Sequence, residues 1–208
     1  MAAALVDFKT WRKFSVLTLD QQGLKQTAHA LAASVSGFQP NMLIGIRSGG
    51  YHVAQLMAES MQGCTLLGIT CRRPGTSKKQ KSSLLKRLLR KLPHQITDRL
   101  RVLEHIVLTQ LRPAKVSTVI PDASELSEIE RELMQRKEGA RVLIVDDAID
   151  SGATMAYVRT LVNAIANPSA AVKMAAITVT TASPVTEPDF SLYRYVLCRF
   201  PWSLDSRK

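Results

Sequence analysis

The stretch that decides the fold of this 208-residue chain is Val142-Leu-Ile-Val-Asp-Asp-Ala-Ile-Asp-Ser-Gly-Ala-Thr-Met155. Its first four residues are apolar and predict a buried strand, which ends in two adjacent carboxylates, Asp146 and Asp147. A tight turn at 150–154 then leads into an expected helix over 153–166. This order is typical of a parallel α/β sheet, in which ligands bind at the carboxyl ends of the strands.

The chemistry of this segment fits a sugar phosphate. Backbone N–H groups at a helix N-terminus form an anion site, and Gly152 lets the backbone approach a ligand closely. The carboxylates of Asp146 and Asp147 repel phosphate and suit sugar hydroxyls or a divalent cation. The segment therefore predicts a phosphate in the turn and a diol on the acids. The structural alternative is that the acids only end a strand and that Asp150 or Ser151 only caps a helix.

Apolar runs and helical patterns alternate along the rest of the chain, which predicts a doubly wound parallel sheet. Asp20 is expected to cap the first helix, and Asp122 or Ser124 to cap a later one. We expect strands at 42–46, 65–70, 115–120, 142–145, 172–181 and 193–200, and helices at 21–35, 52–61, 84–92, 96–111, 124–137 and 153–166.

The segment 142–155 resembles the phosphoribosylpyrophosphate (PRPP) motif of the type I phosphoribosyltransferases. That motif has four apolar residues, two acids, a short apolar link and Asp or Thr before Thr/Ser-Gly-x-Thr, and every position matches here. The resemblance implies that Asp146 and Asp147 hold the ribose hydroxyls and Mg²⁺. It also implies that the 5-phosphate is cradled by the turn and its residues Ser151, Gly152, Ala153 and Thr154.

Asp150 narrows the resemblance to the 6-oxopurine enzymes, the hypoxanthine-guanine and xanthine-guanine phosphoribosyltransferases. These enzymes carry Asp at this position, whereas many pyrimidine and orotate enzymes carry Thr. In the purine enzymes this Asp faces N7 of the base as the proposed general acid or base. The resemblance therefore implies that Asp150 is the catalytic residue of this chain.

A glycine turn follows the first expected strand of the sheet. Paired glycines after a strand let the backbone approach a bound anion. The turn resembles the pyrophosphate loop of the same family, often Arg-Gly-Gly or Lys-Gly-Gly, where the peptide before the first glycine is often a non-proline cis bond. Here Ser48 separates the arginine from the glycines. The resemblance implies that PRPP is bound by Arg47, Ser48, Gly49 and Gly50.

Two features near the C-terminus concern the base. The 6-oxopurine enzymes usually have a lysine near the end of the strand that corresponds to 172–181, where it reads O6 of the purine. Residues 178–182 read Thr-Val-Thr-Thr-Ala and contain no lysine. Phe200-Pro-Trp202 resembles the Pro-Trp element of the xanthine-guanine enzymes, which implies that Trp202 stacks on the base.

The positive charge of the chain lies in one segment. The net charge is +11, and the residues from Arg72 to Lys115 hold 13 Lys or Arg and only 2 acidic residues, so this segment carries the whole excess. We expect 72–91 to be mobile and to close over pyrophosphate. The same charges could bind nucleic acid or an anionic membrane, since leucines line one side of 84–92. Alternatively, these leucines dock on the body or on a second subunit.

Together these observations predict one α/β domain over 1–208, with a small C-terminal hood and a basic loop and helical insertion over 72–139. The expected function is transfer of 5-phosphoribose from PRPP to a purine-like heterocyclic base, with Mg²⁺, in purine salvage. The alternative is a non-catalytic PRPP or nucleotide sensor whose insertion binds nucleic acid. Few cysteines and no apolar run of membrane length favour a cytoplasmic protein, expected to be a homo-oligomer without a membrane partner.

Overall fold

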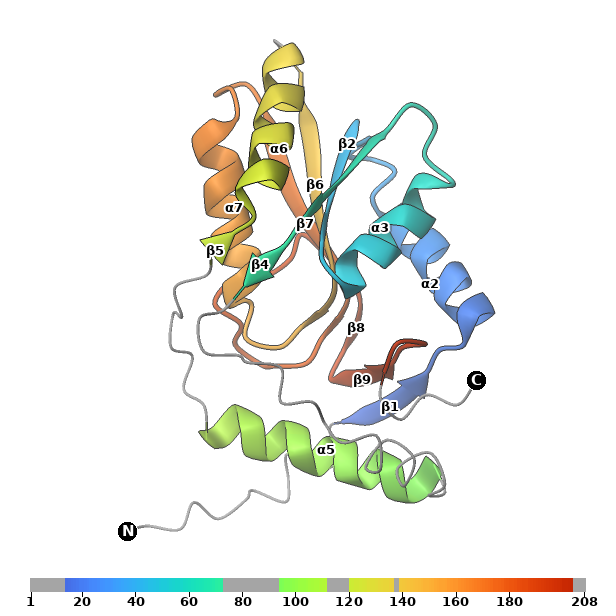
Figure 1. Cartoon of the computed structure of the whole chain (residues 1–208). Helices are drawn as coiled ribbons and strands as arrows, with labels where there is room; N and C mark the ends of the chain where they lie inside the picture. Colours follow the sequence, from blue (N-terminus) through green and yellow to red (C-terminus); the bar gives the residue numbers. More distant parts are fainter. Residues whose placement is uncertain (1–13, 73–93, 112–119, 137–138, 204–208) are drawn as a thin grey trace.

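A computed structural model describes residues 14–72, 94–111, 120–136 and 139–203. Its centre is a five-stranded parallel sheet in the order β3-β2-β6-β7-β8 (Figure 1). The elements in chain order are β1 (Ser15–Thr18), α2 (Gln21–Ser34), β2 (Met42–Ile46), α3 (Gly49–Ala58), β3 (Thr65–Ile69), β4 (Cys71–Arg72), α5 (His94–Leu111), β5 (Ile120–Pro121), α6 (Ala123–Gln135), β6 (Arg141–Ile149), α7 (Ala153–Ile165), β7 (Ala171–Val179), β8 (Phe190–Arg194) and β9 (Val196–Arg199).

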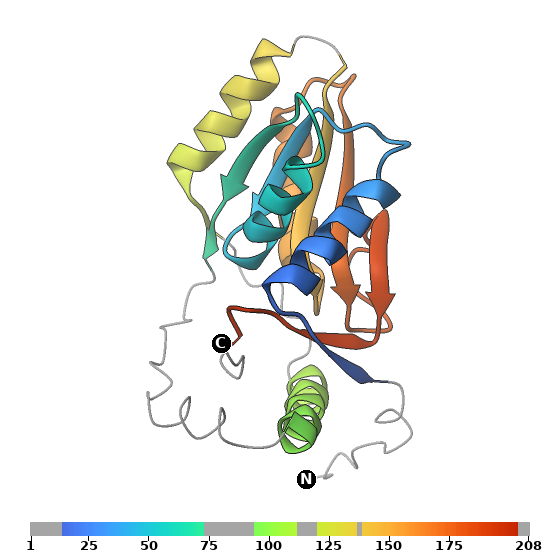
Figure 2. The same cartoon turned by 90° about the vertical axis from the view of Figure 1, so that its right-hand side faces the viewer.

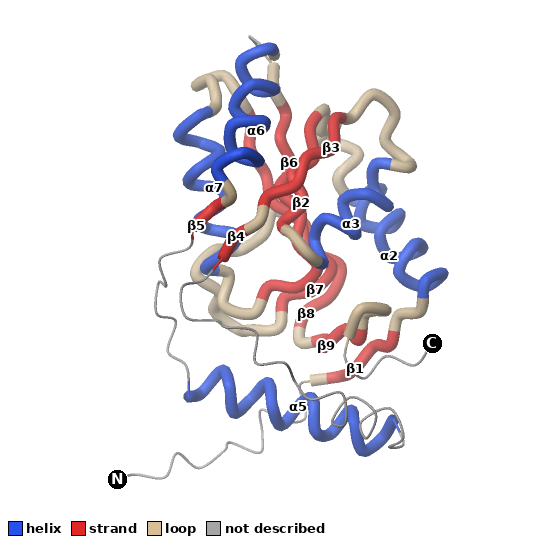
Figure 3. Tube along the Cα trace, viewed as in Figure 1, coloured by secondary structure: helices blue, strands red, loops and turns tan. Residues whose placement is uncertain are grey.

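Helices cover both faces of the sheet, so the expected doubly wound α/β fold is confirmed (Figure 3). Leu43 and Val145 pack with α2 and α3 on one face. Ile44 and Ile144, one residue away, pack with α6 and α7 on the other face. Side chains alternate between the two faces along a strand, and here both faces are buried. The strands are therefore apolar without alternation, which is what marked them in the sequence.

The helix caps follow from side-chain chemistry. Asp20 accepts a hydrogen bond from the backbone N–H of Gly23 at 2.7 Å and caps α2, as predicted. Asp122 caps α6 by accepting from Ser124 N and Glu125 N. The start expected for the second helix, at 52, is wrong, because α3 begins at Gly49. Its glycines indicated a loop, but their lack of side chains lets the helix start directly against β6.

The expected single strand over 193–200 is also wrong. The chain forms β8 and β9 instead, separated at Tyr195, whose φ of 59° is left-handed. Because this residue turns the backbone, β9 leaves the main sheet and pairs in parallel with β1, Ser15 opposite Val196. The strand β1 was not predicted. The pair β1-β9 forms a hood at the carboxyl end of the sheet, and α5 lies below it (Figures 1 and 2).

A partly buried ion pair attaches α5 to the hood. The side chain of Arg199 in β9 is fully buried, and its guanidinium lies 2.6 Å from Oδ1 of Asp98 in α5. It also donates to the hydroxyls of Thr18 at 2.7 Å and Thr97 at 3.2 Å. The helix expected over 96–111 is present as α5. The expected helix 84–92, the segment 72–91 that we expect to be mobile (apart from Arg72) and most of the expected strand 115–120 lie outside the described residues.

The two partners of this ion pair should differ in their effect on stability. Asp98→Asn leaves a buried guanidinium without its counter-charge, so we expect it to lower the free energy of unfolding by about 3 kcal/mol. Arg199→Met should cost less, because Asp98 is 36% exposed and can be hydrated. Thermal unfolding followed by circular dichroism compares the two variants. A larger loss for Arg199→Met would contradict this account.

The three cysteines carry free thiols. Burial raises the pKa of Cys71 to about 11 and that of Cys198 to about 12. Both groups are therefore protonated and unreactive at neutral pH. Among the described helices, none is long and apolar enough to cross a membrane.

Candidate active site

The glycine turn and the acidic strand end meet at the carboxyl ends of β2 and β6. A Cβ atom on Gly49 would lie 2.2 Å from Oδ2 of Asp147. A Cβ atom on Gly50 would lie 2.5 Å from the carbonyl oxygen of Val145 and 2.6 Å from Cα of Asp146. Only glycine allows these approaches. The structure therefore brings together the two motifs that the sequence places about 100 residues apart.

This contact makes a specific test of the site possible. Gly50→Ala would force a methyl group against the backbone of β6, so we expect loss of PRPP binding and a destabilisation of about 1–3 kcal/mol. Gly37→Ala is the matched control, because nothing lies within 4 Å of a Cβ atom there. Calorimetric titration with PRPP and Mg²⁺ measures the effect. Equal PRPP affinity in both variants would show that the glycine turn is not part of the site.

The two acids lie in a poorly solvated position at the end of β6. The backbone N–H of Asp147 donates to Oδ1 of Asp146 at 2.9 Å. Burial, with a further contribution from the adjacent carboxylate, raises the pKa of Asp146 well above its ordinary value. Burial also raises the pKa of Asp147, although hydrogen bonds from its surroundings, including one from Trp202, act in the opposite direction. Two confined negative charges of this kind favour a cation or hydroxyl donors beside them.

These acids fit Mg²⁺ only in part. Carboxylate oxygens are suitable ligands, and Mg²⁺ is usually held by one or two carboxylates together with substrate phosphates. The described residues contain no group of three or more His, Cys, Asp or Glu side chains that could hold a metal. The donor set therefore fits a cation that PRPP helps to bind. Asp146 and Asp147 are the residues that would hold it.

The turn at 150–154 carries the start of α7. Gly152 has a φ of 75° and occupies the N-cap position without a side-chain hydrogen bond to the helix. The connection between β7 and β8 packs onto this turn: Val185 N donates to Ser151 O at 2.8 Å, and a Cβ atom on Gly152 would lie 3.1 Å from Thr186 N. The sequence contains no local signal for this contact.

Asp150 does not cap α7. Its Oδ1 accepts a hydrogen bond of 2.7 Å from the hydroxyl of Thr180, which lies just after β7. The carboxylate is therefore directed across the strand ends, where a ligand of this fold is expected, and the structural alternative of a simple helix cap does not apply to it. Thr180 has no signal of its own in the sequence, because it meets Asp150 only through the pairing of β6 with β7.

Arg47 is engaged by protein groups. Its Nε lies 2.9 Å from Oε1 of Glu125 in α6, and its guanidinium lies 4.3 Å from the ring centre of Tyr51. Glu125, which was missed in the sequence, also accepts from the backbone N–H of Thr70. The cis peptide is Arg47–Ser48, one bond before Ser48–Gly49, the position that the resemblance to the family implies.

Trp202 lies beside this site in an aromatic cluster. Its ring stacks on Phe200, with centroids 4.9 Å apart and planes 5° apart, and the ring of His52 is 5.3 Å away. It is 38% exposed. The indole ring that we expect to stack on a base therefore also packs against two aromatic rings, those of Phe200 and His52. The indole also contacts Asp147.

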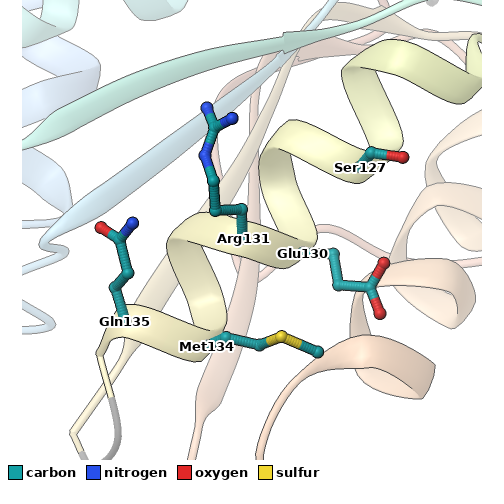
Figure 4. Close-up of a pocket in the computed structure, with 5 residues that line it drawn as sticks. All are labelled: Ser127, Glu130, Arg131, Met134 and Gln135. Atoms are coloured by element: carbon teal, nitrogen blue, oxygen red, sulfur yellow. The ribbon is translucent and has the colours of Figure 1, made fainter.

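Two hollows in the described part of the chain lie away from this site. One, of about 460 Å³, lies along α6 and is lined by Ser127, Glu130, Arg131, Met134 and Gln135 (Figure 4). The other, of about 550 Å³, lies at the opposite end of the sheet, near Asn41 and Arg141. Neither is lined by the predicted site residues.

The sequence of this chain matches the phosphoribosyl transferase domain family over residues 17–205. The chain therefore belongs to this family and is a phosphoribosyltransferase, an enzyme that transfers phosphoribose from PRPP to a base. No curated protein sequence matches it significantly. The match to the family over 17–205 confirms the predicted membership of the type I family.

Solved structures confirm the fold. The purine phosphoribosyltransferase of Pyrococcus horikoshii is 17% identical, with a TM-score of 0.56 over 90% of this chain and 93% of the other. The xanthine-guanine-hypoxanthine enzyme of Helicobacter pylori is 12% identical, with a TM-score of 0.56 over 91% and 93%. A hypothetical protein from Neisseria gonorrhoeae with bound ppGpp is 14% identical, with a TM-score of 0.57 over 91% and 89%.

Proposed function

We propose that this protein transfers 5-phosphoribose from PRPP to a ring nitrogen of a purine-like base and releases pyrophosphate. The observation that carries this proposal is the close approach of Gly49 to the carboxylate of Asp147. A backbone turn suited to pyrophosphate and an acid suited to the ribose diol then lie side by side, which matches the arrangement of these groups in PRPP. Two of the similar structures are of phosphoribosyltransferases that are named for purine bases, which supports the choice of a purine-like base.

The residues of the site would divide the substrate between them. The turn at 48–50 would approach the pyrophosphate through its backbone, and the turn at 151–154 would bind the 5-phosphate with backbone N–H groups. Asp146 and Asp147 would accept hydrogen bonds from the ribose hydroxyls. When bound, Mg²⁺ would offset the charge of the pyrophosphate leaving group. Because the substrate is held at both ends, catalysis would come mainly from positioning and electrostatics.

Asp150 would handle the proton of the base. A purine that gains a bond to C1′ at one ring nitrogen must lose a proton, and a carboxylate beside the imidazole ring can accept it. The bond between C1′ and the pyrophosphate oxygen breaks as the new C–N bond forms, and the electron pair leaves with pyrophosphate. Positive charge that develops at C1′ would be stabilised by the neighbouring anions.

The end of β7 would shape the choice of base. Thr180, Thr181 and Ala182 lie where the 6-oxopurine enzymes usually have a lysine, so no cation from this stretch would bind an O6 atom. We expect a purine-like base whose recognition does not depend on that ammonium group. Trp202 would contribute an aromatic surface near the site.

Pyrophosphate release tests this function. Purified protein would be incubated with PRPP, Mg²⁺ and single bases, including adenine, hypoxanthine, guanine and xanthine. We expect release with at least one purine and formation of its nucleotide. PRPP binding without release with any base would favour the non-catalytic sensor, and absence of PRPP binding would overturn both.

A further inference from the structure

We propose that Thr180 is the positioning residue that holds the Asp150 carboxylate toward the acceptor, an inference that rests on the proposed proton-transfer role of Asp150. Thr180 follows β7 directly, at the carboxyl end of the sheet and beside the end of β6. Its Oγ1 lies 2.7 Å from Oδ1 of Asp150. Because an ionised carboxylate can only accept, the hydroxyl is the donor.

Thr180 is well placed to hold another residue because it is itself fixed. It is only 2% exposed, and its backbone N–H donates to Ile149 O at 2.9 Å. Its carbonyl oxygen lies 3.1 Å from Nε2 of His105 in α5. A carbonyl only accepts, so this nitrogen carries the proton. Contacts from β6 and from α5 therefore fix Thr180 from two sides, and its hydroxyl has a defined position.

The contact with Thr180 restricts the orientation of the Asp150 carboxylate. Asp150 is an exposed residue, and an exposed carboxylate without a partner samples several side-chain orientations. Here Oδ1 is held by Thr180, while Oδ2 has no hydrogen-bond partner among the described residues. The second oxygen is then available for a proton. A carboxylate that is already held in one orientation lowers the entropic cost of reaching the geometry for proton transfer.

The same contact limits Thr180 itself. A threonine hydroxyl has one proton to donate, and its two acceptors in the structure are Oδ1 of Asp150 at 2.7 Å and Ile149 O at 3.2 Å. The shorter contact, to a charged acceptor, is the stronger one. The hydroxyl therefore cannot donate to an oxygen of the base at the same time. The group that the end of β7 presents to the acceptor is the carboxylate of Asp150, and its orientation becomes a determinant of the rate.

Thr178 provides a matched control on the same strand. It is fully buried, and its hydroxyl donates to Val196 O at 2.7 Å, which joins β7 to the hood strand β9. Thr178→Val and Thr180→Val each remove a buried hydroxyl that donates to a backbone carbonyl, Val196 O or Ile149 O, and keep the branched side chain. The two variants differ in that only Thr180→Val removes a contact with Asp150.

The experiment compares steady-state kinetics of the wild type, Thr180→Val, Thr180→Ser and Thr178→Val with PRPP and the accepted base. Loss of a hydrogen bond to a charged group predicts a roughly 10- to 100-fold lower kcat in Thr180→Val, with an unchanged KM for PRPP. Thr180→Ser restores the hydroxyl and should keep kcat within about 3-fold, well inside the loss expected when that bond is absent. Thr178→Val should lower Tm but keep kcat.

The outcomes separate this inference from the proposed function. A wild-type kcat in Thr180→Val, or an equal loss in Thr180→Val and Thr180→Ser, overturns the role of Thr180 while the transfer activity stands. If the wild type releases no pyrophosphate with any base, the proposed function fails. A crystal structure of Thr180→Val then decides the inference: an Asp150 side chain turned to a new orientation supports it, and an unchanged orientation overturns it.

Discussion

Replacing Asp146 and Asp147 together by asparagine should weaken PRPP binding by roughly 10²–10⁴-fold, since two hydrogen bonds from the ribose hydroxyls to charged acceptors are lost. The asparagine side chains keep the size of the acids, so the contact of Gly49 with residue 147 is retained in shape. Calorimetric titration with PRPP and Mg²⁺ measures the loss. Glu128→Gln with Glu132→Gln on α6 is the charge-matched control and should leave the affinity unchanged.

The same double variant should unfold at a higher temperature than the wild type when no ligand is present. The pKa of Asp146 is raised in the folded protein, because burial and the charge of Asp147 disfavour its ionised form. The folded state therefore binds this proton more tightly than the unfolded state, and stability falls as the pH rises through the raised pKa. Asparagine removes that penalty. The gain in Tm should be largest at neutral pH and should shrink as the pH is lowered.

Weaker PRPP binding together with a higher Tm would show that the two acids serve ligand binding although they lower the stability of the folded protein. Acids that were only structural would give the opposite pattern, with a lower Tm in the variant. Undiminished PRPP affinity in the double variant would remove the diol assignment. A loss of affinity accompanied by a lower Tm would instead indicate that the variant disturbs the end of β6.

The main sheet could be predicted from the sequence because its signals are local. The apolar runs at 42–46 and 142–145 are continuous, since each strand is covered by helices on both faces. The caps at Asp20 and Asp122 also depend on neighbours a few residues away. The resemblance to a known motif then indicated how the acids and glycines would meet.

The hood could not be predicted in the same way. The pairing of β1 with β9 joins residues about 180 positions apart, and neither short strand has a distinctive pattern. The chain breaks at Tyr195, a left-handed residue that is neither glycine nor asparagine, so no residue type typical of a turn marks this position. The buried Arg199 likewise has no signal of its own, because arginines usually lie on the surface.

The site shows the same division between local and distant signals. Asp146 and Asp147 lie in the last part of β6 and Asp150 directly follows it, so the three acids could be identified together from one segment. Glu125, the partner of Arg47, comes from α6, a helix about 80 residues further along the chain and within the insertion expected over 72–139. The hydroxyl of Thr180 gains its importance only from the pairing of β6 with β7. Sequence spacing along one segment carries no information about such cross-strand partners.

Replacing Asp150 by asparagine should separate binding from transfer. The amide has the size of the acid and keeps an oxygen that can accept from Thr180, so PRPP affinity should stay close to that of the wild type. It cannot accept the proton of the base, and loss of a general base typically slows a reaction by roughly 10²–10⁴-fold. Rapid-quench measurement of nucleotide formation with saturating PRPP gives the rate of the transfer step.

The control for this prediction is a double variant in which Thr180→Val is added to Asp150→Asn. In a protein that already carries Asp150→Asn, Thr180→Val should cause little further loss, because a positioning residue has no effect once the group that it positions is inactive. Independent, multiplying losses would show that the two residues act separately. A wild-type transfer rate in Asp150→Asn with the accepted base would show that its carboxylate takes no proton in the reaction.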